Sequence, residues 1–361
     1  MRAVRIRAGR PLSAERQREL IGAVLTRDVR VGAERWSKGR RLSVEDVACL
    51  GAGPVAAAAP GRDARPLTLL VLEPGDLHED DAALRLATAV AGGDPGRHGL
   101  ALRGPAESRI DLLAAADGVL HVRTAALERI DRLDPLEVFT ALDGQVAARG
   151  DLVASVKVAP HVVSGSVVEE AVRLSGRGIV RLSAFRPRRV GAIVKESLHA
   201  PGRERFERSV RGKVEALGSR LTAVEYVEDA VEPVTAALAR LVRGGLRVDL
   251  VLAAGGASTD PLDPFYLAIE RLGGRVVRHG VPAHPGSMLW LARIGRTDLV
   301  GLPTCGAFSK ATAADLLIPR LLAGERADAR TVARLGHGGL LTRAMRFRMP
   351  AYARELEAPE G

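Results

Sequence analysis

Cysteine, aromatic residues and long apolar runs are scarce in this chain of 361 residues. The only cysteines are Cys49 and Cys305, which excludes a disulfide framework and a cysteine-ligated zinc site. No run of 18 apolar residues predicts a membrane-spanning helix. The first seven residues lack the apolar stretch of a secretory signal. We therefore expect a cytoplasmic protein whose thiols stay reduced, with no membrane partner.

The formal net charge of +10 raises the question of nucleic-acid binding. Only five of the 53 basic residues are lysine, and the arginines are scattered, with one cluster at 186–189. Aromatic residues make up 3% of the chain, too few to form stacking platforms for bases. We therefore expect no nucleic-acid partner.

A chain of this length predicts two or three domains. Residues 51–66 are rich in alanine, proline and glycine and are typical of a linker. Changes in sequence pattern divide the chain into an N-terminal mixed segment, a middle α+β domain, an α/β domain and a C-terminal extension, at residues 1–60, 67–185, 186–325 and 326–361.

Strand and helix patterns alternate regularly from Arg188 to Leu322. Strands are expected at 190–194, 221–226, 248–253, 275–279 and 299–302, and helices at 203–217, 231–243, 264–272 and 309–322. Such alternation predicts an α/β fold with a mostly parallel sheet wrapped by helices. The carboxyl ends of parallel strands meet at one edge of a sheet, where ligands usually bind.

The segment from Val248 to Asp263 is the most informative part of this alternation. An apolar run stops at Gly255 and Gly256, an oxygen-rich loop follows, and a helix pattern opens at Pro264. Glycines at the end of a strand can bring backbone N–H groups close to an anion. Asp263 could hold a metal ion or accept a proton, whereas the alternative is an ordinary turn between a strand and a helix.

Four loops follow expected strands, at residues 195–199, 255–263, 279–287 and 301–310. They contain carboxylates, histidines, hydroxyls, lysines and many free amides. This set of groups suits a phosphorylated or otherwise anionic ligand, with or without a divalent cation.

Three of these loops resemble the molybdenum-cofactor biosynthesis fold of molybdopterin molybdotransferases (bacterial MoeA, the E domain of gephyrin) and of the MoaB/Mog-like proteins, which include molybdopterin adenylyltransferases. The Gly255–Asp263 stretch resembles the family's Gly-Gly loop that closes on an aspartate. His279-Gly280-Val281 followed by Pro285-Gly286 resembles its His-Gly-Val…Pro-Gly loop. Gly301-Leu302-Pro303 resembles its Gly-Leu-Pro loop. The resemblance is strong over residues 188–325 and weaker at 22–29 and 38–50.

The resemblance implies a protein of molybdenum-cofactor biosynthesis or handling, with molybdopterin as ligand or substrate and Mg²⁺ as a candidate cofactor. It implies catalytic roles for Asp263 and Glu196, with Asp263 also a metal ligand. The residues assigned to the bound pterin on this basis are Gly255, Gly256, Ser258, Thr259, His284, Pro285, Gly286, Ser287, Gly301, Pro303, Thr304, Ser309 and Lys310. We also expect a homo-oligomer and partners among other molybdenum-cofactor enzymes.

The chain departs from the family pattern at several positions. His284 and Ser287 stand where the family has two lysines, and Lys195-Glu196-Ser197 replaces Gly-Asp-Glu. Thr304-Cys305-Gly306 replaces Gly-Asn-Pro, and the Asp-x-Ser-Ala-Met-Asp-Gly-Tyr segment has no counterpart. These departures support pterin binding better than molybdate insertion. Two functions therefore stay open: a binding protein that acts as carrier, sensor or scaffold, or an active transferase that inserts molybdate into adenylated molybdopterin.

Several single residues allow two interpretations. Asp76, His78 and Glu79 could form a metal cluster, but the start of a helix explains them better. Glu196, His284 and Lys310 could each face the ligand or simply lie in solvent, and Cys305 could be buried or reactive. Trp36 and Trp290 are expected in a core or an interface, and Ser43 with Asp46 is expected to cap a helix at 44–50.

Overall fold

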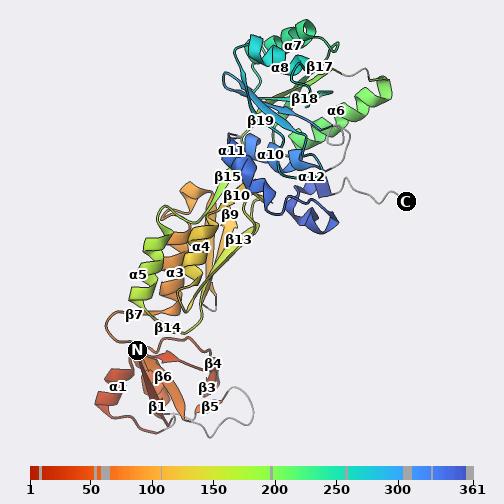
Figure 1. The fold of residues 1–361 in the computed structure, drawn as a ribbon. Coiled ribbons are helices and arrows are strands. Elements are labelled where there is room, and N and C mark those ends of the chain that lie inside the picture. Colours follow the sequence, from red (N-terminus) through yellow and green to blue (C-terminus); the bar gives the residue numbers. More distant parts are fainter. Residues whose placement is uncertain are drawn as a thin grey trace. The chain divides into compact units, whose positions relative to one another are not determined.

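A computed structural model describes residues 1–7, 10–52, 55–57, 66–106, 108–195, 198–256, 259–303, 311–326 and 328–354 (Figure 1). The chain forms two compact units. Unit 1 comprises Met1–Leu113, Val122–Ala141 and Asp151–Arg181, and unit 2 comprises Ala114–His121, Leu142–Gly150 and Leu182–Gly361. None of the described helices combines the length and apolarity needed to cross a bilayer.

The first part of unit 1 contains two small antiparallel sheets and two helices. One sheet has the order β1-β6-β2 and the other β4-β3-β5. Their bounds are Arg2–Ile6 (β1), Val24–Leu25 (β2), Val29–Val31 (β3), Glu34–Trp36 (β4), Val55–Ala57 (β5) and Leu67–Val71 (β6), with helices Ala14–Leu20 (α1) and Val44–Ala52 (α2). Leu67 and Leu69 of β6 join one apolar core with residues from 4 to 50. Strand β5 lies within the stretch predicted as a linker and pairs with β3.

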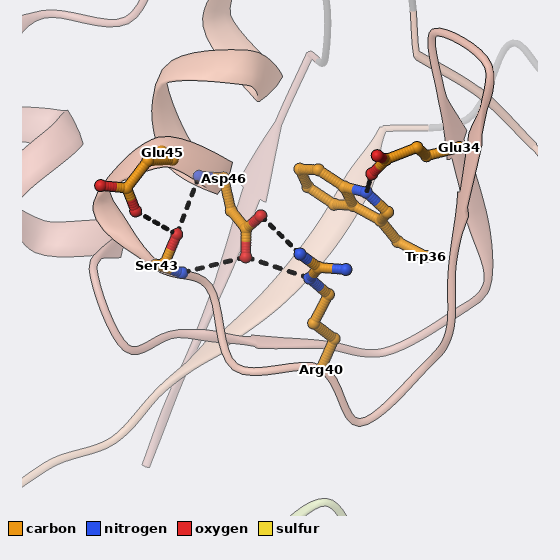
Figure 2. Close-up of polar contacts among 6 residues, drawn as sticks. All are labelled: Glu34, Trp36, Arg40, Ser43, Glu45 and Asp46. Atoms are coloured by element: carbon orange, nitrogen blue, oxygen red, sulfur yellow. Dashed lines mark hydrogen bonds and ion pairs between the residues drawn. The ribbon is translucent and has the colours of Figure 1, made fainter.

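The start of α2 confirms the predicted cap. The backbone N–H of Asp46 donates to Ser43 Oγ (3.1 Å), and Asp46 Oδ2 accepts from the backbone N–H of Ser43 (3.1 Å). This reciprocal pair satisfies two N–H groups that a helix leaves without intrahelical partners. Arg40 donates to both Asp46 oxygens, at 3.0 and 2.7 Å, and its guanidinium lies over the ring of Trp36, as Figure 2 shows.

The rest of unit 1 is a four-stranded sheet of order β11-β13-β9-β8 with helices on one side (Figure 1). Its strands are Leu100–Ala106 (β8), Arg109–Ala114 (β9), Leu136–Thr140 (β11) and Leu152–Val158 (β13), and its helices are Glu79–Val90 (α3), Thr124–Asp131 (α4) and Gly165–Ser175 (α5). Strands β7 (Asp76–His78) and β14 (Val162–Ser164) pair separately, and Gly96–His98 forms a 3₁₀ turn.

Unit 2 contains a six-stranded, mostly parallel sheet of order β17-β16-β18-β21-β20-β19, which confirms the predicted α/β class. Its strands are Arg189–Val194 (β16), Arg220–Tyr226 (β17), Leu250–Ala254 (β18), Arg275–His279 (β19), Trp290–Ile294 (β20) and Thr297–Gly301 (β21). Strand β20, which the sequence analysis missed, is antiparallel to β21 and β19. A small sheet of β12 (Val146–Ala147), β10 (Gly118–Val122) and β15 (Val180–Ala184) also has most of its residues in this unit.

Alternation along the strands divides the interior of unit 2 into two cores. In β18, Leu250, Leu252 and Ala254 face a core shared with α6 and α10, whereas Val251 and Ala253 face α7 and α8. Figure 1 shows α7 and α8 side by side. The helices are Ala200–Glu215 (α6), Val231–Arg243 (α7), Pro264–Arg271 (α8), Ala313–Leu322 (α10), Ala329–Ala333 (α11) and Ala351–Arg354 (α12), with 3₁₀ turns at Arg334–Gly336 and Arg343–Arg348.

Candidate functional site

The ends of six strands meet along one edge of the unit 2 sheet. The register places these ends level with one another, through the pairs Val194–Tyr226, Val194–Ala254, Ala253–Gly301, Trp290–Gly301 and His279–Trp290. Because β16, β17, β18 and β21 run parallel, the loops that leave their carboxyl ends share this edge. We call it the strand-end edge: the chain directly after β16, β17, β18, β19 and β21. The structure thus brings together the described parts of the four loops predicted to follow strands.

Asp263 closes the loop after β18 and is the N-cap of α8. Its Oδ1 accepts a hydrogen bond from the backbone N–H of Phe265 at 2.9 Å. The side chain is only 1% exposed. Its Oδ2 lies 3.0 Å from the Nζ of Lys195, which is itself only 2% exposed. Asp263 is therefore a buried, charge-paired carboxylate that also caps a helix, while its role as a metal ligand or proton acceptor stays a prediction.

Lys195 follows β16, the strand that lies between β17 and β18. Its Nζ also lies 2.5 Å from Oδ1 of Asp229, in the loop after β17. Asp229 is 60% exposed, so the buried ammonium is paired with one solvent-facing carboxylate and one buried carboxylate. Burial by itself lowers the pKa of Lys195, but the hydrogen bonds to Asp229 and Asp263 outweigh it and raise the pKa above the usual value. Lys195 therefore stays charged at neutral pH.

Two glycines of the strand-end edge make room for the indole of Trp290. A Cβ on Gly301 would lie 2.0 Å from the Trp290 ring, and one on Gly256 would lie 3.3 Å from its Nε1. The ring packs against Phe265 and Tyr266, with centroid distances of 5.7 and 5.5 Å. Trp290 is 3% exposed, so the predicted core role is confirmed. Packing therefore requires a glycine at position 301 and leaves little room for a side chain at position 256, apart from any approach of a ligand to their backbone.

The loop after β19 is fixed against the start of α10. The Pro285 carbonyl accepts from the backbone N–H of Ala313 at 2.9 Å, and a Cβ on Gly286 would meet that nitrogen at 2.8 Å. Gly286 also has a φ of +103°. His284 is exposed, and its Nδ1 lies 3.5 Å from Ser287 Oγ. His284 and Ser287 therefore lie in a loop whose backbone is held against the start of α10.

For the other predicted site residues, the structure gives only the exposure or the backbone conformation, or no description. Thr259 is exposed in the loop after β18, and Pro303 is half-buried after β21. Gly255, with a φ of +86°, begins the loop after β18. Glu196, Ser258, Thr304, Ser309 and Lys310 lie outside the described residues, as does Cys305.

The described residues do not fit a metal ion at this edge. Asp263 has a hydrogen-bond donor on one oxygen and the Lys195 ammonium on the other. No group of three or more His, Cys, Asp or Glu side chains suited to a metal occurs in the described ranges. Asp76, His78 and Glu79 likewise form no such group. His78 is the N-cap of α3 and accepts from the backbone N–H of Asp80, which confirms the predicted role of this segment at the start of a helix.

Neither the pairing of Lys195 nor the presence of Asp229 at this edge was predicted from the sequence. A signal for both residues was present, because each lies within three residues of an expected strand end. Their contact with Asp263 depends on the strand order β17-β16-β18, which places the lysine between the two carboxylates.

Residues 195–323 match the model of the family described as "Probable molybdopterin binding domain". The C-terminal part of the chain therefore carries a domain of this family. The match begins at Lys195 and includes the loops after β16, β17, β18, β19 and β21. It supports a role in molybdenum-cofactor biosynthesis with molybdopterin as ligand or substrate.

Three solved structures are similar in fold to parts of the chain. They are a molybdopterin biosynthesis MoeA protein from Pyrococcus horikosii (16% identity, 62% of this chain, 69% of that one, TM-score 0.29), MoaB from Thermus thermophilus (20%, 38%, 98%, 0.29) and a Mog protein from Mycobacterium ulcerans (19%, 38%, 93%, 0.28). At these TM-scores the likeness adds nothing to the family match. No curated protein matches the chain.

Proposed function

We propose that the strand-end edge of unit 2 binds the phosphate-bearing part of molybdopterin, and that the protein is a molybdopterin-binding protein of molybdenum-cofactor biosynthesis or handling. The register of the sheet carries this proposal, because it places the loops after β18, β19 and β21 at one edge within the matched domain. The exposed side chains of Thr259 and His284 and the half-buried side chain of Ser287 lie in these loops, and we assign them to the ligand.

The rigid support behind these loops favours a preformed site. Trp290, Phe265 and Tyr266 pack beneath the glycines, and Gly286 lies against α10. A site whose backbone is already ordered loses little conformational entropy when a ligand binds. The backbone of Gly255, Gly256 and Gly301 completes the proposed site.

Substitution of Gly256 tests the proposed site. In Gly256→Val the new Cβ would lie 3.3 Å from Trp290 Nε1 and 3.4 Å from the Phe265 ring, so the larger valine side chain would displace the backbone that we assign to the ligand. We expect molybdopterin affinity to fall at least about tenfold, as follows from a cost of ~1–3 kcal/mol for a polar group left without its partner. Pterin fluorescence titration measures the affinity, and circular dichroism shows whether the variant is folded. Unchanged affinity in a folded variant would contradict the proposed site.

The alternative is an active transferase that inserts molybdate into adenylated molybdopterin with Mg²⁺. The buried carboxylate of Asp263 is the observation that favours it, since such a group can act in transfer chemistry. The pairing of Asp263 with Lys195, together with His284 and Ser287 in place of lysines, favours binding without turnover. Release of AMP from adenylated molybdopterin, after molybdate and magnesium are added, would establish the transferase. Our proposal predicts no release above the rate without protein.

A further inference from the structure

Three neighbouring strands each place one charged side chain at the same point of the strand-end edge. Asp229 comes from the loop after β17, Lys195 directly follows β16, and Asp263 ends the loop after β18. Because β16 lies between the other two strands, its lysine lies between the two carboxylates, at 2.5 and 3.0 Å. The three side chains therefore form a row of alternating charges, negative, positive and negative, at the centre of the strand-end edge.

The positive charge at the centre of this group is inaccessible to water. Lys195 and Asp263 are 2% and 1% exposed. The Lys195 ammonium also lies 5.8 Å from the centroid of the Phe265 ring, within the range of a cation–π contact. A buried carboxylate such as Asp263 requires a partner of opposite charge, because an isolated charge in the interior is strongly destabilising. Either an ammonium or a metal ion could be that partner.

We propose that the ammonium of Lys195 is the built-in cation of the strand-end edge. It occupies the position between Asp229 and Asp263 that a divalent metal ion would need, and it thereby excludes such an ion. Mg²⁺ and Mn²⁺ bind through one or two carboxylates and several waters, so two carboxylates without the lysine would meet their minimum requirement. A metal ion and an ammonium both within coordination distance of one Asp263 oxygen would repel each other strongly.

A consequence for ligand binding follows, and it rests on the proposed function. Molybdopterin binding is independent of divalent metal, because the charge of Asp263 is already neutralised by the chain itself. The exclusion of the metal does not rest on the proposed function, since it concerns only the described residues Lys195, Asp229 and Asp263.

The test uses Mn²⁺ alone, with the full chain and no pterin, and follows the free Mn²⁺ signal by electron paramagnetic resonance. Wild type is expected to show no site tighter than about 1 mM, a value typical of weak carboxylate sites. The variant Lys195→Ala removes the ammonium and leaves both carboxylates. Its affinity for Mn²⁺ is expected to be at least about tenfold higher than that of wild type, because the two acidic groups then lack a counter-ion.

A matched control separates this effect from a general loosening of the loop. The double variant Lys195→Ala/Asp263→Asn lacks both the ammonium and one carboxylate, so it should lose the gained Mn²⁺ site. If Lys195→Ala fails to fold without metal, Mn²⁺ should restore its circular dichroism spectrum, and Mg²⁺ should do so at higher concentration.

Two results would overturn the proposal. One is a Mn²⁺ site in wild type, tighter than about 1 mM and lost in Asp263→Asn, since it would show that metal and lysine coexist. The other is a Lys195→Ala variant that neither gains Mn²⁺ affinity nor is refolded by Mn²⁺. Because no pterin is present, neither result bears on whether the domain binds molybdopterin.

Discussion

Asp46 of unit 1 and Asp263 of unit 2 each lie at the start of a helix and pair with a basic side chain. Asp46 of unit 1 caps α2 and accepts from Arg40, whose side chain is 41% exposed. Asp263 of unit 2 caps α8 and pairs with Lys195, which is 2% exposed. Each aspartate accepts a hydrogen bond from a backbone N–H and pairs with a basic side chain, but the two basic side chains differ in their exposure to solvent.

The difference shows how position in the fold determines what an ion pair contributes. The Arg40 guanidinium is hydrated, so its pair with Asp46 is screened and serves mainly to complete a cap. Lys195 and Asp263 are removed from water, so each needs the other. The Lys195–Asp263 pair also lies where several strand ends meet, which makes it part of a candidate site, whereas the Arg40–Asp46 pair lies beside Trp36 in the first part of unit 1.

The largest expected effect is the loss of the buried cation. Lys195→Met keeps most of the side-chain length and leaves Asp263 buried without its ammonium, so we expect the free energy of unfolding of unit 2 to fall by about 3–5 kcal/mol. Arg40→Met is the matched change in unit 1 and should cost only about 1 kcal/mol. Urea unfolding can be followed separately, by Trp290 fluorescence in a Trp36→Phe background and by Trp36 fluorescence in a Trp290→Phe background. Equal losses for the two variants would contradict the comparison.

The second largest expected effect concerns Gly301, which packs against Trp290 at the strand-end edge. Gly301→Ala places a methyl group 2.0 Å from the Trp290 ring, so the indole must shift. We expect a loss of about 1–3 kcal/mol in the free energy of unfolding, as for other overpacked cores. Gly212→Ala in α6 is a control, because nothing lies within 4 Å of its Cβ position, and it should be neutral or stabilise the helix. Thermal melts followed by circular dichroism would reveal the difference, and a neutral Gly301→Ala would exclude the packing role.

The smallest effect concerns the pH dependence of the Arg40–Asp46 pair. Burial raises the pKa of Asp46, but hydrogen bonds from Arg40 and from the Ser43 N–H lower it more, so the folded pKa lies below the usual 3.8. Such a carboxyl stabilises the folded state above the unfolded pKa and loses this contribution as the pH falls through the folded pKa. We expect Asp46→Asn to cost about 1 kcal/mol at pH 6 and less as the pH falls below 3.8. A difference that stays constant down to pH 2.5 in urea titrations would argue against the shifted pKa.

Much of unit 2 was predictable because its elements are local patterns. The alternation of apolar runs with amphipathic segments gave the helices at Val231–Arg243 and Pro264–Arg271 within one residue at either end. Strand β20 was missed although Gly295-Arg296 separates two apolar runs, as in a hairpin. The predicted boundaries of the four segments stay a prediction.

The site was predictable in position but not in its contacts. The rule that ligands bind at the carboxyl ends of parallel strands located the loops. It could not show that Lys195 pairs with Asp263, since these residues are far apart in sequence and meet only through the strand order. It also could not show that Gly301 accommodates Trp290, because that requirement arises from the register of β20 on β21.

The most direct test of a ligand site at the strand-end edge is the molybdopterin affinity of two charge variants, measured by pterin fluorescence in buffer with magnesium. Thr259→Asp adds a negative charge to the exposed loop after β18. Arg296→Asp places the same side chain in the turn between β20 and β21, at the opposite end of these strands. We predict that Thr259→Asp weakens binding about tenfold or more through repulsion of the phosphate, while Arg296→Asp binds like wild type. Equal affinities for wild type and Thr259→Asp, or no binding by wild type, would contradict the account.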